Sequence, residues 1–399
     1  MDGYLVDWAN LLLRWAHVIT AIAWIGSSFY FVFLDNSLTP PEDPELRDKG
    51  VGGQLWAVHG GGFYHPQKYL VAPKKMPAHL HWFYWESYTT WLTGFGLFTV
   101  LYLFNAGTFL IDKSVHDWSP GVAIAAALAF LVVGWFAYDL ICRAFGQRKH
   151  GDLIVGIGVL VYAAFASWLA CQLFAGRAAF LIVGAMLATT MSANVFFWII
   201  PGQRKVVAQL RAGEPVDPVH GWRAKQRSVH NTYFTLPVLV TMLSNHYGWL
   251  YSGPHNWLVL VVLMLAGALI RHSFVARHKA LAEGRRVPWE HAAAGTAALI
   301  GLVVWLAPPP SAPASGTLPT VTFAEVKAVV DQRCAVCHNE QLKSKGVALH
   351  TPELLRQHAQ TVYQQAAVLK LMPLNNATQI TEDERALIRR WYEAGAPTR

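Results

Sequence analysis

Cysteine and charge are both scarce in this sequence. Of its 399 residues only 4 are Cys and 14% are charged, whereas 54% are hydrophobic and 17 are Trp. So few cysteines argue against a disulfide framework, and we expect Cys142 and Cys171, which lie in apolar stretches, to be small core residues. So little charge excludes an ordinary soluble enzyme and favours an integral membrane protein.

The start of the chain lacks the marks of a secretory signal peptide. The stretch MDGYLVDWAN has neither a basic region nor a small-residue cleavage site, so we expect the first apolar segment to be retained as a membrane span. The formal net charge of +8 does not indicate a nucleic-acid partner, because basic residues in a membrane protein usually mark its cytoplasmic loops.

Apolar runs of about 20 residues, enough to cross a bilayer, recur along the chain and predict eight transmembrane helices. They cover 10–34, 87–105, 120–142, 153–174, 178–200, 233–251, 256–275 and 291–307. Lys and Arg concentrate in the odd-numbered loops, and the even-numbered loops hold little more than Lys113 and Arg177. By the positive-inside rule the odd loops are cytoplasmic, which places both termini on the outer side.

The composition changes after the last apolar run. A Pro/Ala-rich stretch, 308–320, reads as an extended linker, and the polar segment 321–399 shows short helical patterns such as TEDERALIRRWYEAG. We therefore predict an all-α chain: a polytopic bundle of eight helices over 1–307, then a small soluble domain. A domain of about 80 residues is marginal for a core of its own, so a covalent cofactor would help to hold it together.

The most specific motif is Cys334, Cys337 and His338 in DQRCAVCHNEQ. This spacing is the attachment pattern of a c-type haem: two thioethers form to the vinyl groups, and the adjacent His binds the iron. A zinc site would need further ligands, and a thioredoxin-like pair would need a βαβ setting. The motif therefore predicts covalent haem c.

The sixth iron ligand in such electron carriers is often Met, which raises the reduction potential. The stretch LKLMPLNN supplies Met372, followed by Pro373, and the rival ligands are His350 and His358. The motif, the Met-Pro pair and the closing aromatic helix together resemble class I cytochrome c. That family implies attachment of the haem in the periplasm, which agrees with the orientation predicted from charge.

Ionisable groups at membrane depth are costly and by default indicate function. On the outer half, His17 in the first predicted span and His246 near the end of the sixth are at similar depth and could ligate a haem b between two helices. The alternative is that each His forms a hydrogen bond to a nearby backbone carbonyl.

A second polar group is expected on the cytoplasmic half of the bundle. It combines donors, acceptors and aromatic planes, which suits a flat, polar, anionic heterocycle. Each residue taken singly could instead be an interfacial anchor in contact with membrane lipid. The candidates are Glu86, Gln203, Arg204, His230, Asn231 and Arg271.

Three stretches, WFYWESYTTWLTGF, NVFFWIIPGQRK and SVHNTYFTLPVLVTMLSNHYGW, resemble the bacterial membrane-bound urate oxidase (urate hydroxylase) family. The resemblance covers essentially the whole chain, including a C-terminal cytochrome c. It implies a multi-pass protein of the bacterial inner membrane that oxidises urate to 5-hydroxyisourate in purine catabolism. Electrons would pass through the haem to a respiratory acceptor, such as a cytochrome or terminal oxidase, instead of directly to oxygen.

The expected chemistry assigns hypothetical roles to the candidates. Arg204 or Arg271 would hold the urate anion, and Gln203 with Asn231 would read its amide edges. His230 or Glu86 would act as the base.

Three other interpretations remain open. The protein could oxidise another donor, such as a quinol or a different purine. The bundle could merely tether an electron carrier, although a single span would suffice for that purpose. A transporter with an appended domain is the third alternative, but the sequence shows no convincing internal repeat of the kind found in many transporters.

Overall fold

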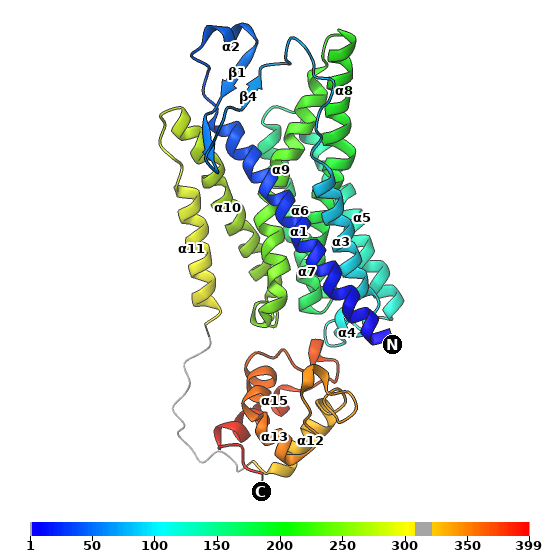
Figure 1. The fold of residues 1–399 in the computed structure, drawn as a ribbon. Coiled ribbons are helices and arrows are strands. Elements are labelled where there is room, and N and C mark those ends of the chain that lie inside the picture. The colour runs from blue at the N-terminus through cyan, green and yellow to red at the C-terminus, as the bar shows by residue number, and fades with distance from the viewer. Residues whose placement is uncertain (1, 308–320, 399) are drawn as a thin grey trace.

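The computed structural model describes residues 2–307 and 321–398. The chain is mostly helical, as predicted, with a bundle of long helices and a separate group of short helices at one end of it (Figure 1). The predicted linker, 308–320, lies outside the described residues.

Each predicted apolar segment falls mainly on one or more helices. Pro120 and Pro218 occupy first helical positions, where their fixed φ and missing N–H are tolerated. The helices of the bundle are α1 (Asp2–Ser37), α3 (Trp85–Phe98) with the π-helix η1 (Thr99–Leu103), α4 (Ala106–Phe109), α5 (Pro120–Phe145), α6 (Gly151–Leu173), α7 (Gly176–Asn194) with the π-helix η2 (Val195–Ile199), α8 (Ile200–Ala212), α9 (Pro218–Leu243) with the 3₁₀ turns η3 (Ser244–His246) and η4 (Gly248–Leu250), α10 (Asn256–Ala282) and α11 (Glu290–Trp305).

Five helical stretches within the described residues are long and apolar enough to span a membrane: Tyr4–Ser37, Pro120–Phe145, Gly151–Leu173, Gly176–Ala212 and Asn256–Ala282. The remaining predicted spans fall on α3, α9 and α11. Of these, α3 has 14 residues and α11 has 16, and the first half of α9 is polar. The structure therefore supports five of the eight predicted spans by this measure, and the other three stay predictions.

Short strands that the sequence did not predict occupy the first loop, after α2 (Pro44–Asp48). Strand β1 (Val51–Gln54) pairs with β4 (Gln67–Tyr69), and β2 (Ala57–His59) pairs with β3 (Gly62–Tyr64), both antiparallel. The turn between β2 and β3 uses Gly60 and Gly61, both with positive φ, which glycine adopts without steric cost. These strands lie at the end of the bundle opposite the chain's N-terminus (Figure 1).

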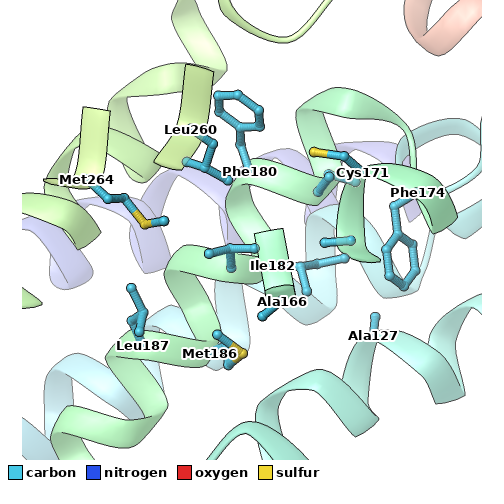
Figure 2. Packing of buried hydrophobic residues seen from close by; sticks show 14 of the residues in the cluster. Ala127, Ala166, Cys171, Phe174, Phe180, Ile182, Met186, Leu187, Leu260 and Met264 are labelled. Atoms are coloured by element: carbon cyan, nitrogen blue, oxygen red, sulfur yellow. The ribbon is translucent and has the colours of Figure 1, made fainter. Parts of the chain in front are cut away.

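The core of the bundle centres on α7, which packs against α5, α6 and α9. Phe180, Ile182 and Met186 on this helix are fully buried and meet Leu260 of α10 and Cys171 of α6 in one cluster (Figure 2). The burial of Cys142 and Cys171 confirms their prediction as core residues.

The C-terminal helical region has a hydrophobic cluster of its own, which includes Val326, Leu355, Ile388 and Trp391. Capping boxes begin two of its helices, at Thr322 and Thr381. Its elements are α12 (Phe323–Arg333), η5 (Ser344–Gly346), α13 (Pro352–Gln357), α14 (Ala359–Val362), the π-helix η6 (Tyr363–Val368), η7 (Leu374–Asn376) and α15 (Glu382–Glu393).

The C-terminal helical region touches the bundle through the loop before η7. The side chain of Leu371 lies directly against Gly248 of η4, and η7 also contacts α4. This contact is at the same end of the bundle as the start of α1 (Figure 1). The loop that carries Met372 therefore sits at the end of α9.

Candidate functional site

The predicted haem c motif begins where α12 ends. The backbone N–H groups of Cys337 and His338 both donate to the carbonyl of Cys334, at 3.1 and 3.0 Å, and form a tight turn. Both cysteines are free thiols. Burial raises the pKa of the Cys334 thiol to about 11, so the protein itself keeps this thiol protonated.

The imidazole of His338 is held through one of its two ring nitrogens. Its Nδ1 lies 3.1 Å from the carbonyl oxygen of Val347, and this partner makes Nδ1 the protonated nitrogen. The other nitrogen, Nε2, then keeps a lone pair for a metal. The residues present therefore fit a covalently attached haem.

The loop of Met372 is fixed by its backbone. The Met372 N–H donates to Gln365 O at 3.0 Å, and its carbonyl accepts from Arg385 Nη1 at 2.9 Å. The rival His350 is half-buried, with its Nδ1 buried and without a hydrogen-bond partner among the described residues. No group of three or more His, Cys, Asp or Glu that could hold a bare metal ion occurs in the described ranges.

Inside the bundle, His230 belongs to a buried polar network. Its Nδ1 lies 2.6 Å from the hydroxyl of Tyr138 on α5. Asn194, at the end of α7, donates through Nδ2 to Tyr138 Oη at 3.2 Å and to Asn231 Oδ1 at 3.0 Å. Asn231 in turn donates to the carbonyl of Met191 at 3.0 Å. Three helices thus hold one imidazole in a single orientation.

A buried cation adjoins this network. Arg227, one turn before His230 on α9, is 3% exposed and donates to Asp139 Oδ1 at 2.9 Å. Asp139 also pairs with Arg143 at 2.6 Å, so two guanidinium groups share one carboxylate. The guanidinium of Arg227 lies 5.0 Å from the ring centroid of Trp198. The cluster therefore carries an excess positive charge, which favours an anion.

Three polar atoms around the network are buried and have no hydrogen-bond partner among the described residues. They are Arg227 Nη1, Trp198 Nε1 and Asn194 Oδ1, two donors and one acceptor. Buried polar groups are normally paired, so each unpaired one calls for an explanation. Trp198 lies within η2, and π-helical turns inside helices are frequent at functional sites. Two unpaired donors and one unpaired acceptor are the types of partner that the C=O and N–H edges of a planar anion require.

The other four predicted site residues, Glu86, Gln203, Arg204 and Arg271, each have surroundings of their own. Gln203 and Arg204 are exposed on α8, where Arg204 lies over the rings of Trp82 and Tyr84. Glu86 is half-buried in the first turn of α3. Arg271 is buried on α10, beside Phe29 of α1. Of the six candidates, only His230 and Asn231 are joined by the network among the described residues.

The two predicted haem b ligands also differ in setting. His17 is half-buried, with Nδ1 at 3.0 Å from Thr90 O and 3.2 Å from Thr93 Oγ1. Its ring packs on Gly94, where a Cβ would come within 2.8 Å of it. His246 is exposed in η3. The bond from His17 to a carbonyl matches the alternative expected for such a residue, and the pairing of the two histidines stays a prediction.

Sequence reasoning missed Tyr138, Asp139 and Trp198 and treated Arg227 merely as a loop charge. A signal was present, since an Asp in the middle of an apolar helix needs a buried partner. Asp139 lies within the third predicted span, and its partner Arg227 comes 88 residues later in the chain. Pairing them requires the packing of α5 against α9.

Comparison with known proteins identifies the family. No curated protein and no solved structure matches the chain. The family model described as Urate oxidase N-terminal matches residues 3–307, a range that includes the whole bundle and its buried network. The chain therefore belongs to the Urate oxidase N-terminal family.

Proposed function

We propose that this protein is a membrane-bound oxidoreductase that converts urate to 5-hydroxyisourate and passes the electrons out through a covalent haem c. The family match over residues 3–307 supports urate or a related purine as the substrate. Cys334, Cys337 and His338, with their fixed turn and free Nε2, support the electron outlet.

The proposal includes eight transmembrane helices in a bacterial inner membrane, with both termini in the periplasm. The beginning of α1 and the C-terminal helical region lie at the same end of the bundle (Figure 1), which is consistent with this topology. The basic loop with the β strands would then face the cytoplasm. The final acceptor would be a respiratory cytochrome or terminal oxidase in contact with the C-terminal helical region.

The reaction sets clear demands on the site. The urate monoanion and one water yield 5-hydroxyisourate, one proton and two electrons, with a C–O bond formed at C5. The site must bind an anion, accept the proton and hold the flat ring in one orientation. The network around His230 contains side chains that could meet each of these three demands.

The residues divide the work as follows. Arg227 Nη1 and Trp198 Nε1 donate to the carbonyl or anionic edge of the purine, and Asn194 Oδ1 accepts from a ring N–H. His230 takes up the proton through Nε2 in the tautomer whose Nδ1–H donates to Tyr138 Oη. Asn231 fixes the amide of Asn194. Glu86 is the alternative base.

A haem attached at Cys334 and Cys337 supplies a one-electron acceptor of high potential when Met372 completes its ligand set. The distance along the helix from His230 to the end of α9 is about 20 Å, because an α-helix rises about 1.5 Å per residue. There, Gly248 meets Leu371 beside Met372. A haem b on His17 and His246 would shorten the electron path. Measured haem content of one per chain would exclude that second haem.

The deciding experiment is anaerobic. Urate is added to the oxidised, detergent-purified protein, and the α band of the c-type haem is followed. Reduction by urate without oxygen is the expected result. Reduction by dithionite or a quinol but not by urate would refute urate as the donor and leave the haem c assignment standing.

A further inference from the structure

A second feature of the bundle lies on a different side of α9 from His230. A pocket of about 420 Å³ opens where α1, α9 and α10 meet. Its walls are almost entirely apolar, and they include Phe29 and Phe33 of α1, Leu236 of α9 and Phe274 of α10. Its polar lining residues are Arg271 and His278, both on α10.

Arg271 in this pocket is buried without a counter-ion. It is 9% exposed, and its Nε and Nη2 have no hydrogen-bond partner among the described residues. Its guanidinium stacks on the ring of Phe29 at 3.6 Å from the centroid. Nε and Nη2 form the edge of a guanidinium that binds two oxygens of a phosphate or carboxylate at once. The flat face is therefore covered by Phe29, and this edge is buried without a hydrogen-bond partner among the described residues.

We infer that this pocket binds the phosphate of an anionic membrane phospholipid. A purine such as urate presents several N–H and C=O edges, and the lining offers it no amide or hydroxyl to pair with them. Buried unpaired polar edges cost free energy, so a heterocycle fits this pocket poorly. An amphiphile with one oxyanion on an apolar body matches one guanidinium surrounded by Phe, Leu and Val.

The surroundings favour an anionic headgroup. A second pocket adjoins the first at Val275, and its lining includes the basic residues Lys279, Arg285 and Arg286. Lys279 and Arg285 pair with Glu283, and Arg286 pairs with Glu290, so the basic residues outnumber the acidic ones. Basic pockets between membrane helices on the cytoplasmic side are typical sites for anionic lipid headgroups. Of the residues that line the pocket of Arg271, Phe33 lies in the last turns of α1 and His278 in the last turns of α10. These helices end at the end of the bundle with the β strands (Figure 1), the end proposed to face the cytoplasm.

The test counts lipids bound to the full-length chain by native mass spectrometry, with phosphatidylglycerol and phosphatidylethanolamine added separately. We expect the wild type to retain phosphatidylglycerol at least 10-fold more than the variant Arg271→Leu. The control Arg277→Leu, an exposed arginine on the same helix, should retain it like the wild type. Arg271→Lys, which keeps the charge but not the guanidinium edge that binds two oxygens, should retain several-fold less phosphatidylglycerol than the wild type.

Several outcomes would overturn the inference. Equal retention of phosphatidylglycerol by Arg271→Leu and Arg277→Leu would do so. Equal retention of phosphatidylglycerol and phosphatidylethanolamine by the wild type would also do so, and this second measurement does not depend on whether any variant folds. Displacement of phosphatidylglycerol by oleate would assign the site to a free carboxylate. Displacement of phosphatidylglycerol by urate would show that Arg271 binds the substrate. None of these readouts requires turnover.

Discussion

The hydroxyl of Tyr138 lies 2.6 Å from Nδ1 of His230, across the contact between α5 and α9. The same hydroxyl accepts a hydrogen bond from Asn194. When Nδ1–H donates to this hydroxyl, Nε2 keeps the lone pair, and a base at His230 acts through Nε2. This relationship makes Tyr138 a positioning residue whose removal can be separated from removal of the base itself.

We expect His230→Ala to slow urate-dependent haem reduction by about 10²- to 10⁴-fold, the usual contribution of a general base. Tyr138→Phe should slow it less and should shift its pH profile, because Nδ1 loses the Tyr138 hydroxyl and keeps the Cys142 thiol at 3.9 Å, while the aromatic ring at position 138 remains. The measurement is the anaerobic reduction rate across pH. Glu86→Gln is the comparison. If His230→Ala and Glu86→Gln both turn over normally, neither residue is the base.

Arg227 is expected to bind the substrate anion. Arg227→Lys keeps a cation beside Asp139 but removes the unpaired Nη1 and the planar stacking on Trp198, so we expect KM for urate to rise about 10-fold, equivalent to about 1.4 kcal/mol. Arg143→Lys is the matched control, because Arg143 pairs with the same carboxylate but is 61% exposed. Equal KM values in the two variants would exclude Arg227 from binding.

The helices of the bundle could be predicted where the sequence of one segment is enough to determine its secondary structure. The apolar runs at 120–142 and 153–174 fall on α5 and α6 because a long apolar stretch must satisfy its backbone internally, as a helix does. Strands β1 to β4 were not foreseen, because each has three or four residues and depends on its pairing across the loop.

The candidate site was predictable in part. His230 and Asn231 stood out as polar residues beside an apolar run. Arg204 is exposed on α8, and its role in binding the anion stays a prediction. Tyr138 and Trp198 look like ordinary membrane aromatics in the sequence. Their meaning depends on which helices pack together, and no local pattern encodes that packing.

Met372 should set the haem potential. Because Met ligation raises the potential, Met372→His is expected to lower the midpoint potential of the haem, measured by redox titration of the α band. His350→Ala and His358→Ala should leave it unchanged. A shift in potential for either of these, with none for Met372→His, would transfer the ligand role to that histidine.

An ion pair in the C-terminal helical region should make its stability depend on pH. Burial alone would raise the pKa of Glu384, but hydrogen bonds from Arg333 and Thr381 outweigh it and lower the pKa. A lowered folded pKa means that the pair stabilises above the unfolded value, about 4.3, and that this stability is lost as the pH falls through the folded pKa.

Glu384→Gln should therefore lower the melting temperature of the full chain at pH 7, as monitored by haem absorption. The difference in melting temperature between this variant and the wild type should shrink below about pH 4. Lys370→Gln, which removes an exposed pair with Glu382, should change the melting temperature little. A deficit for Glu384→Gln that stays constant with pH would show that charge is not its origin.

The contact between Gly248 and Leu371 is expected to control how fast electrons reach the C-terminal helical region. A Cβ at Gly248 would collide with Leu371, so Gly248→Val should displace the loop of Met372 from the end of α9. We expect haem reduction by urate to slow at least several-fold, with dithionite reduction and the haem spectrum unchanged. Gly253→Val is the matched control, because no atom lies near its Cβ position. If both variants reduce at the wild-type rate, electrons enter the C-terminal helical region by another surface.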